Sequence, residues 1–469
     1  MTFITGGCQS KGGLTLNKKL SYKYFPMYKK NRALLPVLLL TAGFLFSGIS
    51  KHSNVSFREI PHNTLEGDQI TPVLAFDQVD RFAAAWVSVP QDEGFPGVFV
   101  RFFNINGDPL GPEFQANTFR NPVEYPSAAG CPSGFVITWV SFWKENQTSG
   151  AVTARRFDSW GNPQGDEFLV NEYIMNYQGN PAVDMDPQGR FVIAWQSWEQ
   201  DGDGYGVYAK IFNSSGEPVS SEIPVNTTVS GNQDQPAVAA AEDGSFIIIW
   251  RSSPAEGEQS GIFGQRFDRS GNRLGQEFQL NFTTFGKAES PDIDTDSSGN
   301  FMVCWHHYRF GLQGYDIYAR IFDSTGKLKS PEILVNSTTS GIQLFPSLSC
   351  TSEGQFMINW LNRPDEEQFR ICSRIFDPNG QPLSDEFTVS GSQNRLRESP
   401  DAVFISLKHN LHIWQEYDPQ YSNWNLYLEI MIQGKPGFRE NPEARWKKKN
   451  ANKNPGRISI SRTGRSSGR

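Results

Sequence analysis

Short apolar runs, separated by turn-forming residues, recur along most of the chain. In one copy, residues 236–240, 246–250, 262–267 and 277–281 read PAVAA, FIIIW, IFGQRF and EFQLN. Runs of this length, bounded by Gly, Asp and Ser, are typical of β-strands. The second run is apolar at consecutive positions, which predicts a strand buried on both faces. We therefore expect each copy to form four strands.

The copies follow one another at a nearly constant period. A proline in the first strand recurs at spacings of 54 or 55 residues: Pro72, Pro126, Pro181, Pro236, Pro291, Pro346 and Pro400. A tryptophan ends the second strand: Trp86, Trp139, Trp195, Trp250, Trp305, Trp360 and Trp414. Seven four-stranded sheets, each covered on both faces by its neighbours, predict an all-β, seven-bladed β-propeller over residues 55–434.

The last copy lacks its fourth strand. Residues 400–432 supply three strands, and no EFxVN segment follows them. Residues 59–63, EIPHN, closely match residues 222–226, EIPVN, which form the fourth strand of another copy. We therefore predict that the N-terminal strand completes the last blade and closes the ring. Asn410 and Glu429 replace the usual Phe and Arg, so we expect this blade to be the least regular.

The third and fourth strands carry opposite charges. The third strand has a cation in five copies: Arg101, Arg155, Lys210, Arg320 and Arg374. The fourth strand begins with a glutamate: Glu59, Glu113, Glu167, Glu222, Glu277, Glu332 and Glu386. We expect a cross-strand ion pair in each blade, which would contribute roughly 0.2–1 kcal/mol. The functional alternative is a ring of carboxylates that binds cations. Because the glutamate recurs in every blade, the structural role is favoured.

The hairpin formed by these two strands follows a recognisable pattern. Residues 261–281 read GIFGQRFDRSGNRLGQEFQLN, and residues 151–171 and 316–336 are close variants. The pattern QRFDxxGxxxGxEFxVN resembles repeats of large bacterial surface and secreted proteins, over about residues 55–434. The resemblance implies an extracellular β-propeller with a binding role, and it brings no catalytic residues.

Charge divides the chain into three zones. Residues 1–51 hold eight Lys or Arg and no acid, and residues 439–469 hold ten against two acids. Residues 52–438 therefore carry a net charge of −23. So acidic a body repels nucleic acid and anionic lipid and attracts cationic ligands.

The ends of the chain indicate export. An apolar stretch at 33–49 follows Lys29, Lys30 and Arg32, the arrangement of a signal peptide over residues 27–50. Residues 1–26 are then a mis-called start upstream of Met27. An uncleaved signal anchor is the competing interpretation and would tether the protein to a membrane. We expect a secreted, periplasmic or cell-surface protein, with a basic disordered tail at 439–469.

Catalytic motifs are missing from the sequence. No Gly-x-Ser-x-Gly, His-Glu-x-x-His, phosphate loop or sialidase-type Asp box occurs. We expect the six histidines to lie at the surface or in turns, and the sequons at Asn213, Asn226, Asn281 and Asn336 to serve turns. Asp201 and Asp203 resemble part of a calcium loop, so a calcium ion is the only cofactor considered, and a polar turn is favoured. Asp184 and Asp294 share a register expected to face the axial channel, as a cation site or as solvated carboxylates.

Alternating strands place two kinds of connection on opposite faces. The loops from second to third and from fourth to first strand share one face, here called the loop face; the short turns share the other, the turn face. The second-to-third loops differ between copies and carry aromatic residues beside acids and amides. We take six as candidate ligand-binding residues: Trp143, Trp198, Tyr205, Tyr308, Tyr417 and Trp424. Aromatic rings with nearby amides and carboxylates can stack on sugars and bind their hydroxyls.

These features favour a non-enzymatic recognition or adhesion module. We expect a monomer that binds a glycan or another surface protein through the loop face. The first alternative is a polysaccharide hydrolase or lyase that uses loop carboxylates such as Glu145, Glu199 or Asp203. The second is a purely structural protein of the envelope.

Overall fold

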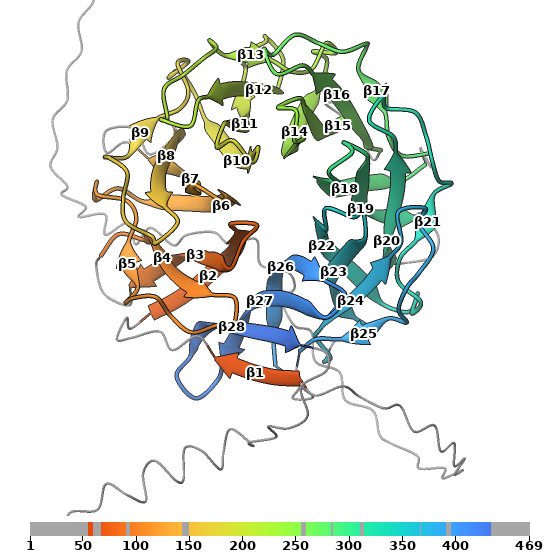
Figure 1. Ribbon diagram of the computed structural model, residues 1–469. Coiled ribbons are helices and arrows are strands. Elements are labelled where there is room, and N and C mark those ends of the chain that lie inside the picture. Colours follow the sequence, from red (N-terminus) through yellow and green to blue (C-terminus); the bar gives the residue numbers. More distant parts are fainter. Residues whose placement is uncertain are drawn as a thin grey trace, which may run out of the picture. The chain divides into compact units, whose positions relative to one another are not determined.

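Seven four-stranded antiparallel sheets surround a common axis (Figure 1). The computed structural model describes residues 55–59, 67–90, 94–142, 150–254, 259–282, 285–309, 314–365, 367–390 and 395–432. Every strand or helix assigned within these ranges is a β-strand. The predicted all-β, seven-bladed propeller is therefore confirmed.

Each blade is numbered in chain order and listed here from its innermost to its outermost strand. Blades 1 to 3 are β2 (Gly67–Phe76), β3 (Arg81–Pro90), β4 (Gly97–Asn104), β5 (Phe114–Gln115); β6 (Val123–Cys131), β7 (Gly134–Phe142), β8 (Gly150–Asp158), β9 (Phe168–Leu169); and β10 (Gln178–Met185), β11 (Phe191–Trp198), β12 (Tyr205–Phe212), β13 (Ile223–Pro224). Blades 4 and 5 are β14 (Asn232–Ala240), β15 (Phe246–Ser253), β16 (Gly261–Phe267), β17 (Phe278–Gln279); and β18 (Lys287–Thr295), β19 (Phe301–Arg309), β20 (Gly314–Phe322), β21 (Ile333–Leu334). Blades 6 and 7 are β22 (Ile342–Cys350), β23 (Phe356–Arg363), β24 (Arg370–Phe376), β25 (Phe387–Thr388); and β26 (Arg397–Ser406), β27 (His409–Asp418), β28 (Asn423–Ile432), β1 (Val55–Glu59).

The blades follow one another around the axis in chain order. Each innermost strand contacts the innermost strand of the next blade, and β26 of blade 7 contacts β2 of blade 1. Blades 5 and 6 are also joined by one parallel residue pair, Tyr315 with Ile342. The contact between β26 and β2 closes the ring.

The N-terminal strand completes the last blade, as predicted, in a different register. β1 pairs antiparallel with β28, from Val55 opposite Met431 to Glu59 opposite Tyr427. In blade 3 the equivalent partner of Tyr208 is Pro224, which the sequence match aligns with Pro61. The pairing is thus shifted by two residues, and residues 60–63 lie outside the described ranges. In blade 3 the outermost strand follows a hairpin turn, and residues 220–222 lie between the turn and the strand. No hairpin connects β1 to β28, so β1 can pair along its whole length in the shifted register.

The second strands are buried on both sides, because each blade is covered by two neighbours. The seven predicted tryptophans are at most 2% exposed. The same burial corrects the expectation for three histidines: His306, His307 and His412 lie in β19 and β27 and are at most 4% exposed. They are interior residues rather than surface or turn residues.

The layer between blades 6 and 7 differs from the others. Its apolar side chains form two small clusters, one around Phe404 and one around Trp414. The same layer also contains buried polar side chains. The Asn359 side chain contacts His412 at 2.9 Å, and His412 contacts Asn410 at 2.7 Å. Blade 7 is therefore the least regular blade in its packing, as predicted.

Each innermost strand has a bulge at the proline that recurs in every repeat. The residue before the proline has a φ between 47° and 53°, and the strand pairing shifts there in every blade. Proline cannot donate to the ladder and is accommodated at such bulges. The seven bulged residues are Thr71, Tyr125, Asn180, Gln235, Ser290, Phe345 and Ser399.

The charged residues of the hairpins connect neighbouring blades, and in blades 2 and 6 these contacts take the place of the predicted ion pair within the blade. The Glu167 carboxylate accepts the Thr118 amide of blade 1 at 2.9 Å, and the Glu277 carboxylate accepts the Thr227 amide of blade 3 at 2.6 Å. Arg374 donates to the Val335 carbonyl of the preceding blade at 2.9 Å. The blade's outer edge is close to its neighbour, so these side chains satisfy the neighbour's free backbone groups.

The asparagines of the EFxVN segments have the structural role expected of them. The Asn226 side-chain oxygen accepts the Val207 amide at 2.7 Å, and Asn281 and Asn336 repeat this contact in their blades. Asn213 accepts the Ser215 and Glu217 amides within its turn. These side chains fix the hairpin geometry.

Candidate functional site

The blades enclose an acidic channel along the axis. A cavity of about 890 Å³ is lined by the innermost strands of all seven blades. Among its described lining residues there is no Lys, Arg or His, and the acids are Asp184, Glu242, Asp292, Asp294, Asp296 and Asp401. The prediction that Asp184 and Asp294 face the channel is confirmed. The cavity therefore carries uncompensated negative charge.

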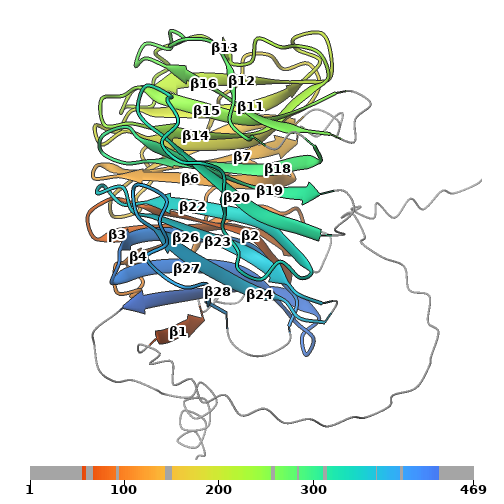
Figure 2. The same cartoon turned by 90° about the vertical axis from the view of Figure 1, so that its right-hand side faces the viewer.

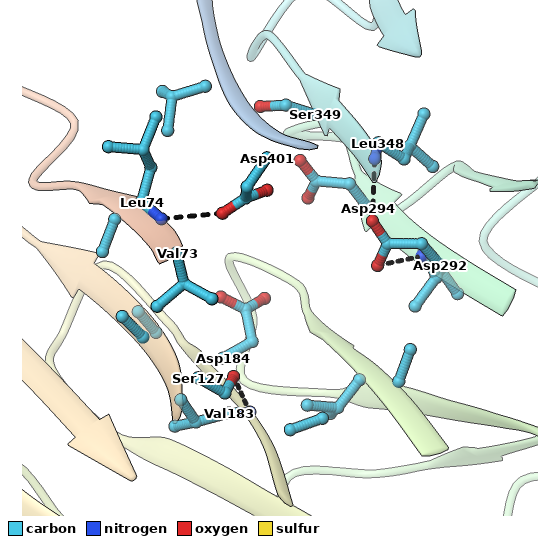
Figure 3. Close-up of a pocket in the computed structure, with 18 of the residues that line it drawn as sticks. Val73, Leu74, Ser127, Val183, Asp184, Asp292, Asp294, Leu348, Ser349 and Asp401 are labelled. Atoms are coloured by element: carbon cyan, nitrogen blue, oxygen red, sulfur yellow. Dashed lines mark hydrogen bonds between the residues drawn. The ribbon is translucent and has the colours of Figure 1, made fainter. Parts of the chain in front are cut away.

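Four of these carboxylates connect blades (Figure 3). Each accepts the backbone amide of the next innermost strand at 2.7 Å: Asp184 from Ala240, Asp292 from Leu348, Asp294 from Cys350, and Asp401 from Leu74. The second oxygen accepts the amide of the following residue in each case. Asp401 also accepts the Ser347 hydroxyl at 2.6 Å. These contacts account structurally for all four side chains.

The channel carboxylates hold their protons more tightly than ordinary aspartates. Burial raises the pKa of Asp184 to about 6 and that of Asp292 to about 7. Repulsion from the channel residues Asp401 and Asp184 adds to the shift of Asp292. Burial, with the charge of Asp184, also raises the pKa of Asp294 well above its ordinary value. In the part of the chain that the structure describes, no three His, Cys, Asp or Glu side chains gather closely enough to hold a metal ion.

The five sequence candidates that the structure describes lie in separate places. Trp198 and Tyr205 meet edge-to-face in blade 3 at 4.7 Å, and Tyr417 and Trp424 meet in blade 7 at 5.6 Å. Tyr308 contacts Tyr315 in blade 5 at 5.0 Å. Trp143 lies outside the described residues. The others thus occupy three separate clusters on the loop face.

The cluster between blades 2 and 3 extends beyond the two candidates, and sequence reasoning missed three of its five residues. Besides Trp198 and Tyr205 it contains Tyr177, whose ring lies 6.4 Å from Tyr205 with the two planes inclined by 77°. Tyr125, the bulged residue of β6, is 46% exposed and lines the channel mouth. Glu124 precedes it in β6. We call these five residues the tyrosine cluster.

A glycine holds one ring of this cluster in place. A methyl group on the Gly179 Cα would lie 2.2 Å from a ring carbon of Tyr177, so the phenol packs directly on the glycine backbone. Tyr177 also contacts Phe142 of blade 2, with ring centroids 6.1 Å apart. Tyr125 lies at a strand bulge, and Tyr177 lies in the connection between two blades. The search for candidates among the loops from second to third strand therefore did not include them. Their position before or near the period proline was the only available indication.

The other two clusters have their charges compensated. Near Tyr315, Arg251 contacts both Asp234 and Glu289 at 2.6 Å, and His306 lies 3.8 Å from Glu289. Near Tyr417, Arg397 contacts Glu416 at 2.8 Å. These charged groups stabilise the ends of the blades.

The loop carboxylates proposed for a hydrolase do not form a cleft. Glu199 and Asp203 are exposed, and Asp203 accepts the Gly231 amide at 3.0 Å. Asp201 contacts the Asn226 side chain at 3.2 Å. Glu145 lies outside the described ranges. The turn face is chemically uniform, since its carboxylates accept amides of their own turns, as Asp268 does from Ser270 and Asn272.

No helix within the described residues is long and apolar enough to cross a membrane.

No protein-family model matches the chain, and no curated protein sequence matches it. Among solved structures it is similar to a protein of unknown function from Dyadobacter fermentans (11% identity, 81% of this chain and 99% of that chain, TM-score 0.47). It is also similar to the β-propeller domain of the trilobed protease from Pyrococcus furiosus (10% identity, 81% and 100%, TM-score 0.46). A third is an α-L-arabinofuranosidase of Fusarium graminearum in complex with arabinobiose (8% identity, 80% and 97%, TM-score 0.45). At these identities and TM-scores the likenesses bear on neither activity nor ligand.

Proposed function

We propose that the protein is a non-enzymatic, extracellular recognition module that binds a glycan through its loop face. One observation carries the proposal. Aromatic side chains gather at three places on the loop face, whereas the turn face repeats one turn whose carboxylate accepts the amides of the same turn. Trp198 is 37% exposed and Tyr125 is 46% exposed. Accessible rings held by a rigid sheet can stack on sugar rings with little loss of conformational freedom.

A glycan array probed with the purified full-length chain tests this proposal. We expect binding to one class of glycan, weakened at least tenfold by Trp198→Ala, which corresponds to about 1.4 kcal/mol. The matched control is Trp160→Ala, which removes an exposed indole from the turn face. Loss of binding in the control with retention in Trp198→Ala would contradict the assignment of the loop face.

A polysaccharide-cleaving enzyme is the second candidate function, favoured by the channel carboxylates. A carboxyl whose pKa lies near 7, as for Asp292, could donate a proton at neutral pH. The enzymatic role is disfavoured because both carboxylate oxygens of Asp292 already accept backbone amides. Reducing ends released from a panel of polysaccharides by the wild-type chain, and not by Asp292→Asn, would establish the enzyme and overturn the non-enzymatic proposal.

A further inference from the structure

The tyrosine cluster leaves a carboxylate without a partner. No hydrogen bond or ion pair from the described residues reaches Glu124, which stands opposite Val140 in the strand pairing. The same register holds Glu289 in blade 5 and Glu398 in blade 7, and both have partners, Arg251 and Gln415. A half-buried carboxylate that lacks a counter-charge is costly unless something else supplies one.

Further oxygen atoms gather around this carboxylate. A methyl group on the Gly150 Cα would lie 2.8 Å from both the Tyr177 ring and Val140, the residue paired with Glu124, so Tyr177 and Glu124 lie near each other. Burial raises the pKa of the Tyr125 and Tyr177 phenols, and Glu124 and Tyr205 add to both shifts. Burial raises the pKa of Glu124 itself. The cluster thus presents a carboxylate and three phenol oxygens, all of which can accept hydrogen bonds. A ligand group with several N–H donors and a positive charge would match this set.

The aromatic rings near Glu124 indicate what the rest of the ligand must be. Trp198 and Tyr125 leave ring surface exposed at the edge of the cluster, and Trp198 is fixed edge-to-face by Tyr205. Rigid, exposed rings bind the apolar face of a pyranose, whereas a flexible alkyl ammonium would lose more freedom on binding. The acidic body, with its net charge of −23, would also speed the approach of a polymer that carries one cation per sugar.

We propose that the tyrosine cluster binds a sugar with a free amino group, whose ammonium lies at Glu124 and whose ring lies on Trp198 and Tyr125. This inference rests on the proposed function and names the ligand class for one part of the loop face. The amino group is the feature that Glu124 recognises. N-acetylation replaces that cation by a neutral amide and removes the interaction.

The test compares two matched oligosaccharides by titration calorimetry with the full-length chain. A glucosamine hexamer should bind at least tenfold more tightly than the N-acetylglucosamine hexamer, a difference of about 1.4 kcal/mol. Glu124→Gln should remove this preference without lowering the melting temperature. The control Glu398→Gln changes the same register position in blade 7, beside Gln415, and should keep the preference.

The outcomes separate this inference from the proposed function. Equal binding of the two hexamers, with binding lost in Trp198→Ala, would overturn the amino-sugar inference and leave glycan recognition standing. Tight binding of a polylysine peptide with no binding of either hexamer would overturn both. If Glu124→Gln lowered the melting temperature, Tyr125→Ala, which alters an exposed ring, replaces it: unchanged binding of the glucosamine hexamer would then overturn the inference.

Discussion

Glu429 is the position at which one side chain departs most sharply from the repeat. Five other blades have a cation there, and Lys210 and Arg374, for example, donate to a carbonyl of the preceding blade. Glu429 is 1% exposed, and its Oε2 atom has no hydrogen-bond partner among the described residues. Burial raises its pKa well above the ordinary value. Burial in the polar layer between blades 6 and 7 therefore favours the neutral form of the carboxyl.

Replacing this carboxyl by an amide should stabilise the protein, increasingly so as the pH rises. Below the unfolded pKa of 4.5 both states hold the proton, so Glu429→Gln should change little. Above it the unfolded chain releases the proton while the folded chain retains it, so the wild type loses stability with rising pH. We expect a gain of about 1–3 kcal/mol at pH 8 from denaturant unfolding. A larger gain at pH 5 than at pH 8 would contradict this explanation.

The side chains that face the channel were predictable, and those of the tyrosine cluster were not. Asp184 and Asp294 share a register in a strand whose place in the propeller follows from the repeat. Glu124 and Tyr125 lie at a bulge where the backbone reverses the ordinary alternation. Strand periodicity cannot reveal that change, because it depends on a φ of 51° that the sequence does not signal.

The strands followed from the sequence pattern because two neighbours bury each blade. Residues 246–250 form a continuous apolar run and appear as part of the buried β15. The closing strand shows the limit of this reasoning. The match between residues 59–63 and 222–226 located the right segment, but its register depends on whether a hairpin precedes it, and β1 has none. The glutamates and arginines of blades 2 and 6 were misassigned because their partners lie in the preceding blade.

Removing β1 should open the last blade. A chain that begins at residue 54 keeps the strand, whereas one that begins at residue 60 exposes the outer edge of β28 along five residue pairs. We expect the shorter chain to melt at least 5 °C lower and to aggregate through its free edge. Differential scanning calorimetry measures the first effect. Equal melting temperatures for the two chains would show that β1 does not contribute to closure.

Seven blades around one axis concentrate negative charge at the centre of the ring. Aspartates from blades 3, 5 and 7 face the same cavity, and the charges of Asp401 and Asp184 raise the pKa of Asp292 beyond the effect of burial. The folded protein therefore binds protons that the unfolded chain releases above pH 3.8. The charge accumulates as the pH rises through about 6 for Asp184 and about 7 for Asp292.

The stability of the ring should therefore fall as the pH rises from 3.8, the unfolded value, to about 7, the folded value for Asp292. A raised folded pKa contributes stability at low pH that is lost as the pH rises through it. We expect Asp292→Asn, which keeps an oxygen for the Leu348 amide, to flatten this decline in chemical denaturation. The control is Asp268→Asn on the turn face, where the carboxylate lies outside the channel and accepts amides of its own turn. A pH profile unchanged by Asp292→Asn would show that channel charge does not control the stability.

The direction of β1 determines how the ring would carry a mechanical load. β1 and β28 run in opposite directions (Figure 2). Because β28 starts at the loop face, where the loop from β27 ends, the antiparallel pairing puts Val55 at the turn face. A pull on that end, opposed by a ligand on the loop face, acts along the axis of β1. Hydrogen bonds between antiparallel strands are perpendicular to that axis, so all five residue pairs with β28 are sheared together. The seam that closes the ring would then yield in one step under tension, rather than unzip pair by pair.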